Sequence, residues 1–437
     1  MKYFNHRLGR VLLAGALSCA VCFAQKKSDL PSNKPANAVE TPDEAERRDL
    51  GQALQDAGTS PVDFLRAIEG HLKKYPNTTR RAELERAAVK AAIEAKDNAK
   101  ILEYGPRVLA NGDRDIQILD RVCRALLDTD SPQNATRAIG YLKLYEQTVL
   151  RMRDEQQPAR MSAAAWHNEI DKGLARVFAL QARATGNLGK IDEALVLAKR
   201  SYDAYPTAEG ARERSRWLAK KGDNAAAVEH LAEAFTIADP HVTEMDRAKD
   251  RLKMGELYQK SNGSEKGLGD VILAAYDRTA AQLADRAARL QAVDPNATAA
   301  HILDFTLPAV QGSPLKLASL KGKTLIFDFW ATWCGPCRAQ HALYEQVEKR
   351  FEKNPKVAFL SINTDEDRGA VPAFLKEAKW DNHVYFEAGL SALLAINSIP
   401  TTIIVDGTGA VASRMNGFVP ERFVDLLTER IQDTLRN

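Results

Sequence analysis

Cysteine is scarce in this chain, with five in 437 residues. Cys19 and Cys22 lie in the first 24 residues, which leaves Cys123, Cys334 and Cys337 for the rest of the chain. One closely spaced pair and one single cysteine are too few for a fold held together by disulfides. An excess of either charge is also lacking, since 61 lysine and arginine residues stand against 58 aspartate and glutamate residues. This near balance argues against a nucleic-acid partner.

The apolar run near the N-terminus is too short to span a membrane. It covers residues 11–24, whereas a transmembrane helix needs about 20 apolar residues. Lys2, Arg7 and Arg10 precede the run, and Ala24 before Gln25 fits cleavage after a small residue. The pattern therefore predicts a signal peptide, residues 1–24, and a periplasmic or other extracytoplasmic location. An uncleaved N-terminal anchor and a lipid on Cys19 are the alternatives.

Hydrophobic periodicity is missing from residues 25–45, whose Pro, Asn, Ser, Lys and Glu content predicts a disordered linker. Residues 46–295 have a helical pattern with few β-branched runs. Segments that begin at Gly189 and Gly222 repeat at an offset of about 33 residues, and the region resembles an all-α tetratricopeptide-like solenoid. Stacked helix pairs form a concave face that can bind a peptide or a protein partner, but they can also be a passive scaffold.

The pattern changes from helical to strand-like after Asp294-Pro295-Asn296, which predicts a second domain over residues 300–437. A nearly continuous apolar run at 325–330 predicts a buried central strand, interrupted by the carboxylate of Asp328. Further strands are expected at 357–363, 384–386 and 401–405. Directly after the central strand, the sequence Trp333-Cys334-Gly335-Pro336-Cys337 opens a segment with helical spacing of apolar residues.

Two cysteines separated by two residues at the start of a helix are typical of a redox pair. The unpaired N–H groups and the dipole of the helix favour a thiolate on Cys334, which is the candidate nucleophile. Cys337, one turn further on, would then resolve the mixed disulfide. Pro336 suits the first helical turn because its missing N–H has no helical partner there. Zinc is the alternative, but neither a second CxxC nor an HxxxH supplies the remaining ligands, so no metal is expected.

The sequences DFWATWCGPC, from Asp328, and SIPTTIIVDGTG, from Ser398, resemble the TlpA/ResA-like extracytoplasmic branch of the thioredoxin family. The resemblance covers about residues 300–437. It implies an α/β thioredoxin fold, with a central mixed sheet flanked by helices, and thiol–disulfide exchange without a cofactor. It also assigns site residues: Asp328 as the buried acid that moves the proton of Cys337, Pro400 as a cis-proline that faces the cysteines, and, for substrate binding, Trp333, Gly335, Pro336, Ile399 and Pro400.

Four positions depart from the family pattern or invite a second interpretation. Ala342 replaces a proline that often kinks the active-site helix, and the lysine that pairs with the buried acid in many thioredoxins is replaced near Ser361. His341 lies one turn after Cys337 and is expected to face solvent rather than to tune the thiols. Cys123, in the helical region, is expected to be a small buried apolar residue.

Taken together, the sequence predicts an exported thiol–disulfide oxidoreductase that reduces protein disulfides. The resemblance implies that a membrane electron donor recharges the CxxC pair, and that cytochrome c maturation or repair of oxidised proteins is the physiological role. A disulfide oxidase or isomerase is one alternative. A binding protein, in which the helical repeats hold a partner and the thioredoxin-like domain is redox-sensitive, is the other.

Overall fold

The computed structural model describes residues 41–154, 158, 161–240, 242–380, 383–417 and 419–436. The predicted signal peptide and most of the predicted linker lie outside these residues. The chain forms two compact units, one made of Met1–Leu150 with Lys172–Thr279 and the other of Arg151–Asp171 with Ala280–Asn437. No helix in the described part of the chain is both long enough and apolar enough to cross a membrane.

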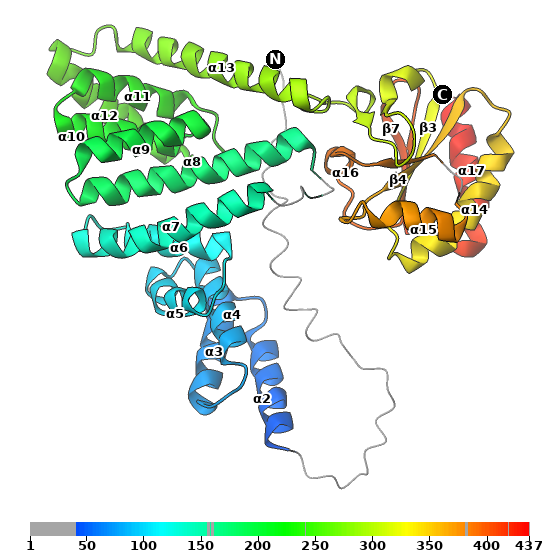
Figure 1. Ribbon diagram of the computed structural model, residues 1–437, viewed down its shortest axis with the longest axis horizontal. Coiled ribbons are helices and arrows are strands. Elements are labelled where there is room, and N and C mark those ends of the chain that lie inside the picture. The colour runs from blue at the N-terminus through cyan, green and yellow to red at the C-terminus, as the bar shows by residue number, and fades with distance from the viewer. Residues whose placement is uncertain are drawn as a thin grey trace. The chain divides into compact units, whose positions relative to one another are not determined.

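The first unit is built from consecutive helices that pack against one another (Figure 1). Its helices, of which α7, α8 and α13 extend into residues of the second unit, are α2 (Pro42–Ala57), α3 (Pro61–Lys74), α4 (Arg81–Glu94), α5 (Asn98–Ala110), α6 (Ile116–Leu126), α7 (Pro132–Asp154), α8 (Ala163–Asn187), α9 (Ile191–Ala204), α10 (Ala208–Lys221), α11 (Asn224–Thr236), α12 (Glu244–Asn262) and α13 (Leu268–Val293). This confirms the predicted all-α region.

Side-chain caps explain where many of these helices begin. Thr41 accepts a hydrogen bond from the backbone N–H of Glu44, whose carboxylate accepts one from the N–H of Thr41. This capping box, with Pro42 in the first turn, starts α2 inside the segment for which the sequence predicts a linker. The side chains of Asp97, Asp115, Thr207 and Asp223 each accept a hydrogen bond from a backbone N–H in the first turn of a later helix and so cap it, without a capping box.

Small residues bring the helices close together. Ala194, Ala198 and Ala227 are completely buried. A side chain at Gly186 would collide with the ring of Trp217, since a Cβ there would lie 2.2 Å from it. The helices α9 and α11 begin 33 residues apart, at the offset on which the repeat was predicted. Assignment of the helix pairs to the tetratricopeptide class stays a prediction.

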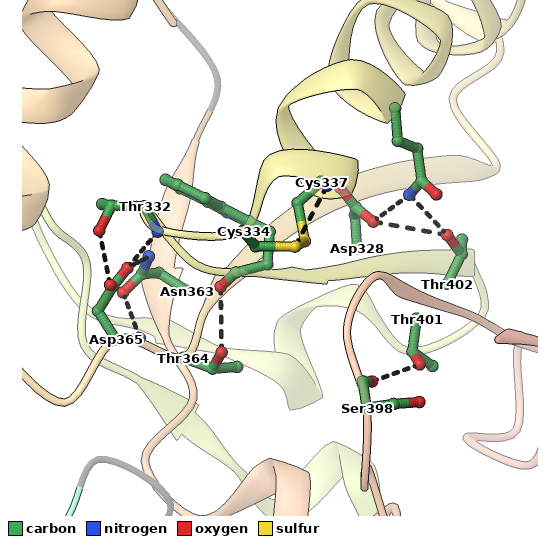
Figure 2. The surroundings of a disulfide bond; sticks show 12 residues. Asp328, Thr332, Cys334, Cys337, Asn363, Thr364, Asp365, Ser398, Thr401 and Thr402 are labelled. Atoms are coloured by element: carbon green, nitrogen blue, oxygen red, sulfur yellow. Dashed lines mark hydrogen bonds between the residues drawn. A yellow bond between two sulfur atoms is a disulfide. The ribbon is translucent and has the colours of Figure 1, made fainter. Parts of the chain in front are cut away.

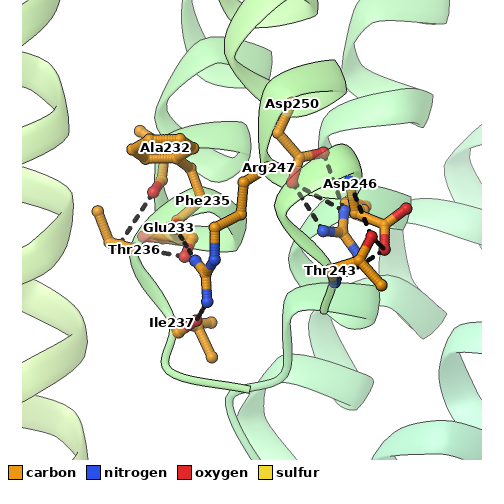
Figure 3. A network of polar contacts seen from close by, with 10 residues as sticks. Ala232, Glu233, Phe235, Thr236, Ile237, Thr243, Asp246, Arg247 and Asp250 are labelled. Atoms are coloured by element: carbon orange, nitrogen blue, oxygen red, sulfur yellow. Dashed lines mark hydrogen bonds and ion pairs between the residues drawn. The ribbon is translucent and has the colours of Figure 1, made fainter. Parts of the chain in front are cut away.

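Two arginines connect α12 to the helices that precede it, α10 and α11 (Figure 3). The Arg247 guanidinium donates to the backbone oxygens of Phe235 and Ile237 at the C-terminal end of α11. There it satisfies carbonyl groups that have no partner within the helix and complements the helix dipole. Arg212 of α10 donates to both carboxylate oxygens of the buried Asp250 of α12, at 2.7 to 3.1 Å.

Further arginine–carboxylate pairs connect α6, α8 and α10. Arg124 donates to both carboxylate oxygens of Glu209, at 2.6 and 2.9 Å, and also to Asp120. Arg183 pairs with the buried Glu213, whose pKa is raised above its usual range because burial outweighs the attraction of the arginine. Cys123 is fully buried beside this cluster and its pKa is raised by burial, which confirms the prediction of a buried structural cysteine.

The second unit contains a five-stranded mixed sheet in the order β5-β4-β3-β6-β7. Its strands are β3 (Thr324–Trp330), β4 (Val357–Asn363), β5 (Val384–Phe386), β6 (Thr401–Val405) and β7 (Val411–Asn416), and β1 (Thr306–Leu307) pairs separately with β2 (Leu315–Lys316). The central strand β3 is parallel to β4 and antiparallel to β6. Every residue of β3 is buried, as the apolar run predicted.

Helices cover both faces of this sheet (Figure 1). The helices α14 (Gly335–Phe351) and α17 (Pro420–Arg436) pack on the face that carries Ile326 and Ile404. The opposite face, with Phe327 and Ile403, is covered by α16 (Leu390–Leu393) and by the 3₁₀ turns at Ile302–Asp304 and Leu317–Leu320. The helix α15 (Ala370–Ala378) precedes β5. The structure is the predicted thioredoxin-like arrangement.

Candidate active site

Cys334 and Cys337 form a disulfide at the start of α14, directly after the central strand (Figure 2). Cys334 is the N-cap residue of this helix, and its Sγ accepts a hydrogen bond from the backbone N–H of Cys337 at 3.2 Å. In the reduced protein, this position offers unpaired N–H groups and the positive end of the helix dipole to a Cys334 thiolate. Both cysteines are buried, whereas Trp333 beside them is 68% exposed.

Asp328 lies in the middle of β3 and is almost completely buried. Its Oδ1 accepts hydrogen bonds from Gln340 Nε2 at 2.8 Å and from Thr402 Oγ1 at 3.5 Å (Figure 2). Burial raises the pKa of Asp328 to about 7, although the two hydrogen bonds act in the opposite direction. Among the described residues Asp328 has no ion pair. A carboxyl group with such a pKa can both accept and release a proton near neutral pH.

The Ile399–Pro400 peptide bond is cis, as the sequence predicted. Ile399 packs against the apolar cluster that contains both cysteines. The backbone oxygen of Pro400 accepts a hydrogen bond from the N–H of Gly417 at 2.7 Å, and Thr401 donates to the oxygen of Ser398 at 2.7 Å. These bonds fix the segment on both sides of the proline. Figure 2 shows Asp328 beside the Cys334–Cys337 disulfide, so Asp328, both cysteines and Ile399 lie around one site.

The C-terminal part of the chain is similar to known proteins. A family model described as Redoxin matches residues 296–428. The thiol-disulfide oxidoreductase ResA of Bacillus subtilis is 28% identical over 123 residues, which are 28% of this chain and 68% of ResA. The thioredoxin-like protein YneN of the same organism is 30% identical over 112 residues, 25% of this chain and 65% of YneN. The C-terminal domain is a thioredoxin-family domain of the TlpA/ResA-like type.

Solved structures of similar sequence include a thiol:disulfide interchange protein DsbE, described as putative, from Chlorobium tepidum. It is 27% identical, and the match covers 30% of this chain and 92% of that chain with a TM-score of 0.28. The thiol-disulfide oxidoreductase from Bacteroides fragilis is 28% identical, with coverages of 29% and 95% and a TM-score of 0.26. The named relatives of this thioredoxin-like domain are thiol–disulfide oxidoreductases, and the domain has a CxxC disulfide. It is a thiol–disulfide oxidoreductase domain.

Ser361 occupies the neighbourhood in which the sequence comparison with thioredoxins expects a lysine to be replaced. Ser361 lies opposite Asp328 in the register of β3 and β4, as expected from the sequence. Among the described residues, the Asp328 carboxyl group has hydrogen-bond donors but no cation as partners, and burial is the main cause of its raised pKa.

Gln340 is a site residue that no sequence motif indicated. Its side chain is fully buried on α14, and its Nε2 donates to both Asp328 and Thr402. Its Oε1 is buried without a hydrogen-bond partner among the described residues. Gln340 follows Cys337 by three residues and precedes Tyr344 by four, so the helical period places all three on the buried face of α14. That spacing was the available signal.

The prediction that His341 faces solvent is wrong. Its ring is buried and stacks on Trp380, with centroids 3.5 Å apart and planes 18° apart. Trp380, which follows α15, also packs on Trp330 and Phe374. The segment between β4 and β6 therefore covers this part of α14. Burial lowers the pKa of His341 to about 4, so the ring is neutral at neutral pH.

Replacement of Gln340 by leucine is expected to raise the pKa of Asp328 further above about 7. The variant loses the Nε2–H donor that stabilises the charged carboxylate, while burial, the main cause of the raised pKa, is unchanged. The carboxyl resonance of Asp328, followed by NMR through a pH titration of the oxidised protein, measures the midpoint. A midpoint at or below that of the wild type would show that Gln340 does not stabilise the anion.

Proposed function

We propose that the chain is an exported thiol–disulfide oxidoreductase that reduces disulfides in protein substrates. The observation that supports the proposal is the Cys334–Cys337 disulfide at the N-terminus of α14, which lies beside a buried carboxyl group whose pKa is about 7 (Figure 2). A nucleophile that is stabilised as a thiolate and a nearby proton acceptor are the two groups that thiol–disulfide exchange requires.

The reaction proceeds in two exchanges. The Cys334 thiolate attacks one sulfur of the substrate disulfide, so that a mixed disulfide forms and the second substrate sulfur leaves as a thiolate. Cys337 then loses its proton and attacks Cys334 Sγ, which releases the first substrate sulfur and closes the Cys334–Cys337 disulfide. Two electrons pass from the cysteine pair to the substrate, and its two sulfurs take up two protons.

The other predicted site residues support these steps. Asp328 accepts the proton of Cys337 as that thiol becomes a nucleophile. The backbone of Ile399 and the ring of cis-Pro400 hold the substrate chain against the cysteines. Trp333, with Gly335 and Pro336, forms the exposed surface on which a protein substrate docks.

The reducing direction needs a source of electrons. The closed disulfide must be reopened after each turnover, and a membrane reductase is the donor that fits an extracytoplasmic enzyme. Export rests on the predicted signal peptide, residues 1–24. Reduction of protein thiols during cytochrome c maturation and repair of oxidised proteins are the roles that fit this chemistry and location.

The helical region, residues 46–295, serves in this proposal as a tetratricopeptide-like module that binds a peptide or protein partner. The thioredoxin-like domain, residues 300–437, carries the chemistry. In this arrangement, either the helical region or the thioredoxin-like domain can select the substrate.

The proposal is tested by exchange with oxidised glutathione. The reduced wild-type chain is expected to lose two thiols per molecule. In Cys334→Ser, the rate of exchange with glutathione is expected to fall to the uncatalysed background, because the thiolate at the helix N-terminus is absent. Cys123→Ala is the matched control, since Cys123 is buried in the other unit. Equal rates for wild type and Cys334→Ser would contradict the proposal and favour a partner-binding role for the chain.

A further inference from the structure

A buried carboxylate, Asp365, holds the loop that leads into the cysteine pair (Figure 2). Asp365 is only 4% exposed. Its Oδ2 accepts from the backbone N–H of Thr332 at 2.8 Å, and its Oδ1 accepts from the Thr332 hydroxyl at 2.7 Å. Both oxygens therefore bind one residue, which lies two positions before Cys334.

Asp365 is itself fixed by the end of β4. Asn363 Nδ2 donates to Asp365 Oδ2 at 2.6 Å, and Asn363 Oδ1 accepts from the Asp365 N–H at 3.1 Å. The intervening Thr364 donates its N–H and its hydroxyl to the oxygen of Trp330, the last residue of β3. The residues that follow two neighbouring strands are thus tied together directly before the active-site helix.

We propose that Asp365 is a positioning residue for Cys334, which its carboxylate keeps at the N-terminus of α14 by binding the backbone and hydroxyl of Thr332. The inference rests on the proposed function, because it assigns Asp365 a role only if Cys334 is the attacking thiolate. Among the described residues no cation pairs with Asp365. Its three donors are a backbone N–H, a hydroxyl and an amide, so the carboxylate acts on the loop through hydrogen bonds.

The position of Cys334 determines how acidic its thiol is. A cysteine at the N-cap is close to the unpaired N–H groups of the first helical turn, and these groups stabilise a thiolate. Release of Thr332 lets the loop and Cys334 move away from this position, so the thiol pKa is expected to rise. A direct electrostatic effect of Asp365 would have the opposite sign, because removal of a negative charge near a thiol lowers its pKa.

The test is the pH dependence of alkylation of the reduced, full-length chain by iodoacetamide. Thr332→Val removes the hydroxyl donor and keeps the charge of Asp365, and we expect the alkylation midpoint of Cys334 to rise by about half a pKa unit. Asp365→Asn is expected to raise it by about one unit, a tenfold loss of thiolate well below the midpoint. Thr332→Ser keeps both donors and is expected to restore the wild-type midpoint.

Tyr344→Phe is the matched control for a general loss of stability. It removes the buried hydrogen bond from the Tyr344 hydroxyl to the oxygen of Ile326 without touching the loop. Its midpoint is expected to equal that of the wild type. The ionisable residues near the pair, Asp328 on β3 and Arg338 and His341 on α14, are unchanged in all these variants, and Asp365 itself is unchanged in both Thr332 variants.

Each outcome decides the proposal. Upward shifts in Thr332→Val and Asp365→Asn, with Thr332→Ser at the wild-type value, support positioning. If the midpoint falls in Asp365→Asn and does not change in Thr332→Val, Asp365 acts by its charge alone. If the midpoint changes in neither variant, or rises equally in Tyr344→Phe, the role of Asp365 is only structural. If Asp365→Asn does not fold, Thr332→Val decides alone. Failure of the proposed function is distinguishable, because Cys334 would then be unreactive towards glutathione disulfide in the wild type as well.

Discussion

Replacement of Asp328 by asparagine is expected to stabilise the C-terminal unit at pH 8, by up to about 4 kcal/mol in the free energy of unfolding. The pKa of Asp328 is raised from 3.8 to about 7 in the folded protein. Above pH 7 the folded wild type must therefore keep a charge in a buried place, while the unfolded chain carries the same charge in water. An asparagine is neutral in both states, and its oxygen can still accept the hydrogen bonds from Gln340 and Thr402.

The sign of the pH dependence follows from the raised pKa. Below the unfolded pKa, near 4, Asp328 is protonated in both states and contributes no penalty. As the pH rises towards 7, the unfolded chain loses the proton first, and the wild type loses stability relative to the variant. Denaturant unfolding of the oxidised protein at several pH values between 4 and 8 measures the difference. Asp425→Asn, at an exposed position on α17, is the control, and parallel curves for Asp328→Asn and wild type would contradict the raised pKa.

The second large effect is expected from replacement of Cys337 by serine. With oxidised glutathione as the probe, the reduced variant should accumulate one glutathione per chain on Cys334, because the thiol that resolves the mixed disulfide is missing. In the wild type, Cys337 displaces glutathione and no adduct persists. Turnover should therefore fall to the background while the first exchange continues.

Mass spectrometry of the intact chain and of its peptides measures this adduct. Cys334→Ser is the matched variant, and it should remain unmodified because Cys337 lies inside the first turn of α14 and not at the N-cap, where the helix stabilises a thiolate. The assignment of nucleophile and resolving cysteine would be reversed by an adduct that accumulates on Cys337 in Cys334→Ser and not on Cys334 in Cys337→Ser.

The order of strand, turn and helix around the cysteines was predictable because it is local. The apolar run of β3, the CxxC turn and the buried face of α14 follow one another within about 25 residues, and each has a period or a cap that the sequence displays. The cis bond before Pro400 was predictable for another reason, the resemblance to the family. These parts required no knowledge of distant contacts.

Contacts between segments that are distant in the chain could not be predicted from the sequence. His341 was expected in solvent because its own helix suggested no partner, yet Trp380, 39 positions later, covers it. Asp365 reaches Thr332 across the ends of two strands, and its sequence neighbourhood of acidic residues resembles an ordinary exposed turn. The pairing of Arg124 with Glu209, 85 positions apart, depends in the same way on how the helices stack.

The reduction potential of the Cys334–Cys337 pair determines whether the domain can reduce protein disulfides. Equilibration of the full-length chain with redox buffers, followed by quantification of free thiols, gives the value. We expect a potential near that of thioredoxin, about −270 mV, at which the reduced pair is a good electron donor. A value between about −120 and −180 mV, the range of disulfide oxidases and isomerases, would contradict the proposed direction.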